Sequence, residues 1–287
     1  MPKQVFSFPD SLDGFLVDDE LFARAYGESA DRERAWMKTC IARLYEWYGP
    51  RRDRAGRIAE SWRSGLESVR AHEPVDFAVV LIGGGFASPA RLLASLVPSL
   101  ACGVEHVLVV RVDGEGDFPS SLLTGMELAG QELVADMGRD DVLSLLRTLA
   151  EAGRSGAVVD LAGLDDPCPE QGRVAWYRPV LDGKAAVFME DGATFDLEAL
   201  AFSHPGSEFV LYGADVDLPA GFVRGGGDEA SFLNAVTDVA YAPFALAGEA
   251  LEAARLVLGP GQEGCWVWPG LHPEFFLFHR TSWTLGD

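Results

Sequence analysis

Apolar runs that alternate with amphipathic segments constrain the fold of this chain more than any other feature of its sequence. Residues 77–82 read Phe-Ala-Val-Val-Leu-Ile, as expected of a strand that is buried on both faces. Ser88 and Pro89 then form an N-cap and first-turn pair. One helix face follows, marked by Leu92, Leu93, Leu96, Val97 and Leu100. Strands that alternate with helices need right-handed crossovers, so the pattern predicts an α/β fold with a mostly parallel sheet.

The same alternation continues along most of the chain. Further short apolar runs, typical of strands, occupy residues 106–111, 132–135, 157–161, 185–189, 209–212 and 265–268. Further helices are expected at residues 122–130, 142–149, 197–202, 229–239 and 249–257. A passage rich in Pro and Gly over residues 163–183 divides the series. We therefore predict two Rossmann-like units with mostly parallel sheets.

The alternation also predicts how the chain is divided. Residues 1–77 are expected to form an N-terminal helical segment that packs on the second unit. Residues 78–180 form the first Rossmann-like unit, residues 181–275 form the second, and residues 276–287 form a C-terminal returning strand. Within the N-terminal segment, the last helix is expected to carry Trp62, Leu66 and Val69.

The net charge of the chain limits the classes of partner that it can bind. The sequence holds 44 acidic and 23 basic residues, for a formal net charge of −21. A field of that sign repels phosphate backbones and anionic lipid headgroups, so we expect neither nucleic acid nor a membrane as partner. The net charge does not exclude a small-molecule ligand. The first residues lack a signal-peptide pattern, and the cysteines form no CxxC pair, so we expect a cytoplasmic protein.

A glycine-rich loop after the first predicted strand is the strongest local motif. Gly83, Gly84 and Gly85 follow the strand and open the helix capped by Ser88, so free backbone N–H groups there could hold a phosphate. Asp113, after the next strand, stands where a ribose-binding acid belongs in a dinucleotide site. Ser88 replaces the third glycine of the fingerprint, and the acid lies farther along the chain than expected. Nucleotide binding and a tight structural turn are therefore both open interpretations.

Six segments, in the same order and at compatible spacing, resemble histidinol dehydrogenase. Leu81-Ile-Gly-Gly-Gly85 begins one of them, and Phe276-Leu-Phe-His-Arg-Thr-Ser-Trp283 is another. The full set is residues 41–47, 81–104, 122–132, 239–246, 264–270 and 276–283. The resemblance implies the α/β scaffold shared by histidinol and aldehyde dehydrogenases. It also implies an ancestral activity, the oxidation of an alcohol with NAD at a zinc ion.

The same resemblance implies that the chemistry of the family is missing. The positions of the family's first two zinc ligands hold Leu200 and Ser203, and a leucine has no lone pair to donate. Phe244 and Ala245 stand where the family has its acid–base pair, and neither can transfer a proton. No counterpart of the remaining zinc ligands follows Pro273. We expect no catalytic residues and no metal site of the family's kind.

Two features could still supply a different chemistry. His204 lies one residue beyond a lost ligand position, and a rescued metal site would need His272, Glu274 or His279 to join it. Gly261-Gln-Glu-Gly-Cys265 resembles the nucleophile loop of aldehyde dehydrogenases with one extra residue. A buried structural cysteine is the alternative interpretation of Cys265.

The sequence leaves two hypotheses. In the first, the chain is a histidinol dehydrogenase-like protein that has lost its zinc chemistry and acts as a non-catalytic binding or assembly module with no cofactor. In the second, it is a divergent NAD(P)-dependent oxidoreductase with another active site, which includes Cys265. The resembled family forms dimers with exchanged C-terminal parts, so the resemblance also implies a homodimer.

Overall fold

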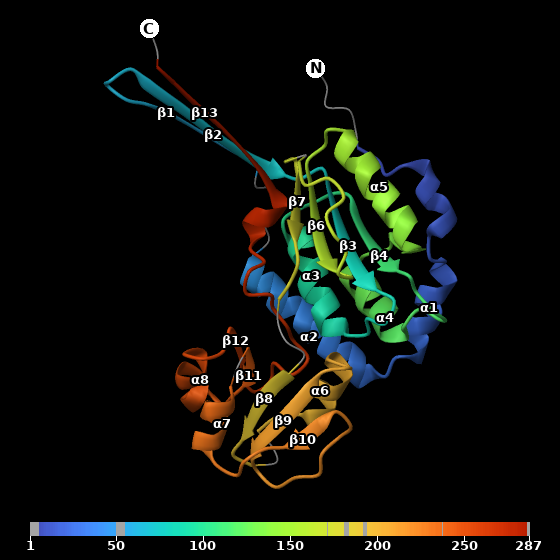
Figure 1. Cartoon of the computed structure of the whole chain (residues 1–287), viewed down its shortest axis with the longest axis vertical. Coiled ribbons are helices and arrows are strands. Elements are labelled where there is room, and N and C mark those ends of the chain that lie inside the picture. Colours follow the sequence, from blue (N-terminus) through green and yellow to red (C-terminus); the bar gives the residue numbers. More distant parts are fainter. Residues whose placement is uncertain are drawn as a thin grey trace.

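The computed structural model of the chain describes residues 6–49, 55–170, 172–180, 184–191, 194–236 and 238–285. Two five-stranded sheets and a projecting three-stranded sheet make up the architecture (Figure 1). Both five-stranded sheets are parallel throughout. The predicted α/β fold with two Rossmann-like units is therefore confirmed. Parts of the predicted segments, residues 1–5, 50–54, 181–183 and 286–287, lie outside the described residues.

The first sheet has the strand order β5-β4-β3-β6-β7. Its strands are β3 (Phe77–Gly83), β4 (Val107–Val112), β5 (Val134–Met137), β6 (Gly156–Leu161) and β7 (Val174–Tyr177). Every residue of the central strand β3 except Gly83 is buried, because helices cover both faces of the sheet. The connecting helices are α3 (Pro89–Ala101), α4 (Ser120–Ala129) and α5 (Arg139–Glu151).

The two faces of the first sheet are buried by different parts of the chain. Val79 and Leu81 pack against α5 and against the N-terminal residues around Leu12, which lies in the 3₁₀ helix η1 (Asp10–Phe15). Val80 and Ile82 point to the opposite face, toward α3 and α4. This alternation follows from the period of two along a strand. Helix α5 and η1 therefore lie on one side of the sheet, and α3 and α4 lie on the other.

The second sheet has the order β10-β9-β8-β11-β12 and is built from shorter pieces. Its strands are β8 (Lys184–Met189), β9 (Glu208–Gly213), β10 (Phe222–Arg224), β11 (Val239–Tyr241) and β12 (Leu256–Leu258). Helices α7 (Glu229–Ala235) and α8 (Phe244–Leu251) cover its outer face. The inner face joins the core of the first unit, with α6 (Leu197–Ser203) at the boundary.

The N-terminal helices α1 (Asp19–Glu28) and α2 (Asp31–Tyr48) lie mainly against the first unit. Helix α1 packs on α4, and α2 packs on both α3 and α4. The predicted packing on the second unit involves helix α2, which contacts α6 and, through Trp36, the loop after β12 at Gly264. Helix α2 therefore bridges the two units, since Met37, Cys40 and Leu44 belong to a core that includes residues of both sheets.

The third sheet is an arm that projects away from both units (Figure 1). It is antiparallel and consists of β1 (Gly56–Ser61), β2 (Leu66–Pro74) and β13 (Leu277–Leu285), with β2 in the centre. The predicted helix at Trp62, Leu66 and Val69 is therefore wrong. The predicted C-terminal returning strand is present as β13, which follows the 3₁₀ helix η2 (Pro273–Phe276).

Three further element predictions need correction. Residues 249–257 are not one helix, because α8 ends at Leu251 and β12 begins at Leu256. The helix expected over 229–239 stops at Ala235, and Val239 begins β11. The apolar run 265–268 is an irregular buried loop rather than a strand. Among the described helices, none has the length and hydropathy needed to cross a membrane.

Candidate functional site

The glycine loop of the first unit lies at the carboxyl end of β3, the edge where open α/β sheets bind ligands. A backbone hydrogen bond from Phe86 N to Gly83 O, 2.9 Å long, closes the loop as a tight turn. Gly84 has no room for a side chain, because a Cβ there would lie 2.2 Å from the carbonyl oxygen of Asp113. Gly85 faces open space, since a Cβ there would meet no atom of the described residues within 4 Å. The structure therefore brings the loop and Asp113 together.

The polar groups of this loop already have partners within the chain. Ser88 caps α3 by accepting a hydrogen bond from Arg91 N at 3.3 Å, as predicted for an N-cap residue. Its hydroxyl also donates to the carbonyl oxygen of Ser203 at 2.7 Å. Asp113 has a left-handed backbone, with φ of 52°, and its carboxylate accepts from Arg139 N at the start of α5. The turn and the caps explain these residues without a bound nucleotide.

Two buried ionic groups stiffen the same edge. The Arg111 guanidinium is held by the Asp136 carboxylate and by the carbonyl oxygens of Gly116 and Asp117, the latter two at 3.0 Å. Asp160, at the end of β6, is 1% exposed and accepts hydrogen bonds from two backbone N–H groups and from Arg178. Sequence reasoning missed both groups, since their partners lie on other strands and loops.

The junction between the units is closed by direct contacts between α3 and the region after α6. The Ser88 hydroxyl bonds to the carbonyl oxygen of Ser203, and Arg91 Nη2 donates to the Ser207 hydroxyl at 3.0 Å. The Arg91 guanidinium also stacks over the Trp266 ring, 4.5 Å from its centroid. These contacts fill the space between the two units with the side chains of both.

His204 lies at the centre of this junction and is 1% exposed. Its Nε2 is 3.2 Å from the Glu263 carbonyl oxygen and 3.1 Å from the Tyr241 hydroxyl. Burial, and then the nearby charge of Arg91, lower the pKa of His204 to about 3. The imidazole is therefore neutral at physiological pH, and burial also raises the pKa of Tyr241.

Three buried polar atoms at the junction have no hydrogen-bond partner among the described residues. They are Arg91 Nε, His204 Nδ1 and Trp266 Nε1. The rings of His204 and Trp266 lie 5.1 Å apart, and Arg91 covers the second of them. Sequence reasoning singled out His204 and treated Trp266 as core, but gave no signal for Arg91 because its partners are distant in sequence.

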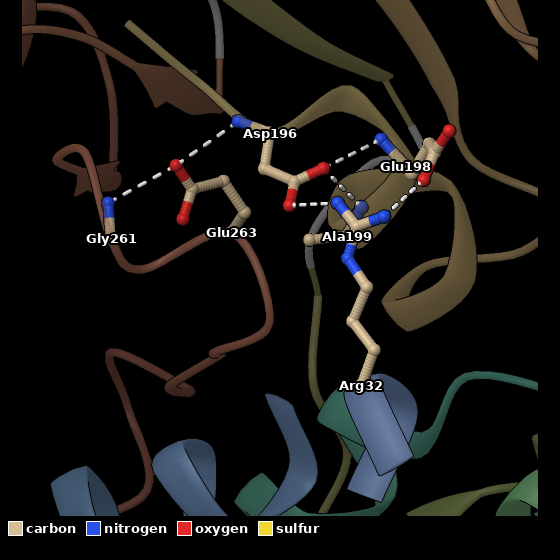
Figure 2. Close-up of polar contacts among 6 residues, drawn as sticks. All are labelled: Arg32, Asp196, Glu198, Ala199, Gly261 and Glu263. Carbon is tan, nitrogen blue, oxygen red and sulfur yellow. Dashed lines mark hydrogen bonds and ion pairs between the residues drawn. The ribbon is translucent and has the colours of Figure 1, made fainter. Parts of the chain in front are cut away.

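A second set of polar contacts holds α2 against α6 (Figure 2). Asp196 caps α6, accepting from the backbone N–H groups of Glu198 and Ala199. Arg32 of α2 forms an ion pair with Asp196 at 2.7 Å and a second one with Glu198. The buried Glu263 carboxylate accepts from Asp196 N and from Gly261 N, which fixes the loop after β12.

The positions that the resemblance assigns to lost chemistry do not share one environment. Leu200 is fully buried in the core that joins the units. Ser203 is 2% exposed, and its Oγ lies 3.5 Å from the position a Cβ would take on Gly264. Phe244 and Ala245, at the start of α8, are exposed, Phe244 to 94%. The structure thus places Leu200 and Ser203 in the interior and Phe244 and Ala245 at the surface.

The proposed rescue of a metal site finds no support in the geometry. His272 precedes η2, Glu274 lies within it, and His279 lies on the arm beside His72. His204 is buried at the junction. Among the residues that the structure describes, no three His, Cys, Asp or Glu side chains form a group able to hold a metal ion.

Cys265 lines a cavity of about 680 Å³ between α2 and β12. It lies in the loop after β12, and only 5% of it is exposed. The buried thiol of Cys40, on α2, is its neighbour, and the two thiols shift each other's pKa. All four cysteines are free. No catalytic base is identified next to Cys265 among its described partners, so the predicted oxidoreductase nucleophile stays a prediction.

Known proteins with similar sequences are histidinol dehydrogenases. The enzyme of Natronomonas pharaonis is 26% identical over 143 residues, which is 48% of this chain and 32% of that enzyme. The enzyme of Haloarcula marismortui is 28% identical over the same shares. The matched part therefore spans about a third of the length of these relatives. No protein-family model matches the chain.

The fold comparison agrees with the sequence comparison. The crystal structure of histidinol dehydrogenase from Elizabethkingia anophelis covers 94% of this chain, and this chain covers 77% of that one. The TM-score is 0.57 at 13% sequence identity, a likeness that concerns the fold. About half of the chain is thus distantly homologous to histidinol dehydrogenase, and the chain has an α/β fold like that of histidinol dehydrogenase.

Proposed function

We propose that this chain is a histidinol dehydrogenase-like scaffold that acts as a non-catalytic binding or assembly module. The observation that carries the proposal is the packed junction between the two units. Leu200 and Ser203, at the positions that the resemblance assigns to zinc ligands, are buried there among side chains of the shared core. Leucine offers no donor and a neutral serine hydroxyl is a poor one, so the residues present do not fit a zinc site.

The acid–base positions support the same proposal. Phe244 and Ala245 are exposed at the start of α8, and neither side chain can give or accept a proton. His204, the one imidazole at the junction among the described residues, is held neutral and buried. Alcohol oxidation needs a group that removes the hydroxyl proton, and these positions provide none.

The exposed edges and the apolar face of the arm support the proposal that two copies of the chain assemble. Its two outer strands, β1 and β13, each have one unpaired edge within the described sheet. One face of the arm carries Ile58, Leu66, Trp283 and Leu285, of which Trp283 and Leu285 are 74% and 77% exposed. An apolar face on a projecting sheet typically marks a protein contact. A self-complementary contact between two such arms would give a twofold dimer.

Size-exclusion chromatography with light scattering tests the assembly. We expect the wild-type chain to be a dimer. Trp283→Glu places a charge on the apolar face and is expected to give monomers. Thr284→Glu is the matched control, because Thr284 points to the opposite face of the same strand, and it should leave the dimer intact. A monomeric wild type, or equal effects of both substitutions, would contradict the assembly role.

The second candidate function is a divergent NAD(P)-dependent oxidoreductase. The observation that favours it is the close approach of Gly84 to Asp113, with open space at Gly85. A nicotinamide cofactor at about 100 times its dissociation constant would stabilise the fold by roughly 2.7 kcal/mol. We expect no thermal shift with NAD, NADH or their phosphorylated forms. A shift that disappears in Gly85→Val, which fills the open space at the loop, would favour the oxidoreductase instead.

A further inference from the structure

The cavity between α2 and β12 has no role in the proposed scaffold function. Its lining includes Arg43 and Trp47 of α2, Leu251 of α8 and Cys265. Trp47 and Leu251 are 74% and 60% exposed, so the cavity opens to solvent at their side. Its volume of about 680 Å³ is sufficient to admit a small organic molecule.

Two thiols meet at the inner wall of this cavity. Cys265 lines the wall, and Cys40 lies behind it on α2 with no exposed surface. The two thiols are neighbours that shift each other's pKa, although they are 225 positions apart in a chain of 287 residues. Cys265 therefore faces the cavity, whereas Cys40 has no exposed surface and does not line it.

The surroundings of the two thiols shift their pKa values in opposite directions. The neighbouring Cys40 thiol, and then the charge of Arg43, lower the pKa of Cys265 against the opposing effect of burial. The neighbouring Cys265 thiol, and then burial, raise the pKa of Cys40. Of the two thiols, Cys265 therefore loses its proton more readily.

We propose that Cys265 is a hydroperoxide-reactive thiol at the wall of this cavity and that Cys40 is its resolving partner. The Cys265 thiolate attacks one oxygen of the hydroperoxide, the O–O bond breaks, and the second oxygen leaves as an alcohol or water after taking a proton. Cys265 becomes a sulfenic acid. The Cys40 sulfur then displaces the sulfenic hydroxyl as water and forms the Cys40–Cys265 disulfide. In sum, two thiols and one hydroperoxide give one disulfide, one alcohol or water from the peroxide, and one further water.

Peptide mapping of the full-length wild-type chain tests the proposal. The chain is treated with less than one equivalent of hydrogen peroxide, its remaining thiols are alkylated, and its peptides are identified by mass spectrometry. We expect the first product to be a disulfide between Cys40 and Cys265. Cys168 is the internal control, because it is the least buried of the four cysteines and would react first if exposure alone decided. Oxidation of Cys168 ahead of Cys265 would overturn the proposal.

Two substitutions on the exposed side of α2 separate the role of Arg43 from a general loss of charge. Arg43→Gln removes the cation beside Cys265 and is expected to slow its oxidation several-fold at neutral pH. Lys38→Gln removes an exposed cation that does not line the cavity and is expected to change nothing. Equal rates in the two variants would also overturn the proposal.

A third substitution tests the resolving step. In Cys40→Ser the first step proceeds without the second, so a sulfenic acid on Cys265 should accumulate and be trapped by dimedone. Absence of dimedone labelling at Cys265 in this folded variant would contradict the reaction of Cys265 with hydroperoxide, and equal labelling of the wild type would contradict the assignment of Cys40 as the resolving thiol. The wild-type mapping requires no substitution, so the proposal stays testable if Cys40→Ser does not fold.

Discussion

The two α/β units of this chain differ in how far each completes its own core. The first unit buries β3 between α5 on one face and α3 with α4 on the other. The second unit has three strands of three residues each and helices of seven or eight residues. Its inner face is covered by elements that also pack on the first unit. The second unit therefore depends on the junction with the first unit for its stability.

The same contrast distinguishes the polar groups of the two regions. At the carboxyl edge of the first sheet, Asp113, Arg111 and Asp160 are all paired within the unit. At the junction, Arg91 Nε and His204 Nδ1 are buried without a hydrogen-bond partner among the described residues. The junction is therefore a region where packing has prevailed over complete hydrogen bonding.

The largest expected effect follows from removing a ring at the junction. Trp266→Ala should lower the free energy of unfolding by about 3–5 kcal/mol, because it leaves a large cavity in the core shared by both units. Urea unfolding followed by circular dichroism measures the loss. Phe244→Ala is the control, since its exposed ring should contribute less than about 0.5 kcal/mol. A loss below about 1 kcal/mol for Trp266→Ala would contradict the dependence of the second unit on the junction.

The next effect concerns the first unit alone. Arg111→Gln should cost about 2–3 kcal/mol, because it leaves the Asp136 carboxylate and two loop carbonyl oxygens without their buried donor. Hydrogen exchange should then increase in residues 113–118 and stay unchanged in the second unit. Faster exchange at β8 to β12 would show that the first unit is less independent than its packing indicates.

The third prediction is a pH dependence carried by His204. Its folded pKa is lowered to about 3, while an unfolded imidazole takes up a proton near pH 6.5. The unfolded state therefore binds the proton first as the pH falls. The stabilising contribution is fully present above about pH 6.5 and declines toward pH 3, by up to about 1.4 kcal/mol per pH unit.

His204→Gln tests this dependence by removing the titrating group. The variant should be less stable than the wild type at pH 7.5, and the difference between them should shrink as the pH falls from 6.5 to 5. The measurement is the free energy of unfolding in urea at each pH. Parallel curves for the two proteins would mean that the pKa of His204 is the same in the folded and unfolded states, and would contradict the prediction.

The smallest expected effect is at the exposed bridge between α2 and α6. Arg32→Gln removes the ion pairs with Asp196 and Glu198 shown in Figure 2. Because these side chains are largely in solvent, the loss in free energy of unfolding should be smaller than that of Arg111→Gln and should fall further at high salt. A larger loss would mean that ion pairs, rather than apolar packing, hold the two units together.

The sequence predicts the elements whose burial leaves a clear periodic pattern. The strand at 77–82 and the helix after Ser88 are both present, since one is apolar throughout and the other is apolar on one face. The helix predicted in the arm is wrong because β2 projects from the core, so that most of its residues are partly or fully exposed and leave no clear periodic pattern. The run 265–268 is apolar because its tryptophans fill the junction, not because it pairs with a strand.

The candidate site could be predicted only where its residues are close in sequence or follow a motif. The glycine loop, its cap at Ser88 and the approach of Asp113 follow from the strand–loop–helix pattern. The contacts of Arg91 with Ser207 and Trp266 join residues more than 100 positions apart, so no local pattern could reveal them. The same is true of the thiol pair Cys40 and Cys265.

Zinc bound per chain tests most directly whether this scaffold has lost the chemistry of histidinol dehydrogenase. The purified protein is incubated with excess zinc, desalted, and analysed for metal and for NADH formation from L-histidinol and NAD. The packed junction at Leu200 and Ser203 predicts no stoichiometric zinc and no NADH. One zinc ion retained per chain, together with NADH formation that a chelator abolishes, would contradict the loss of that chemistry.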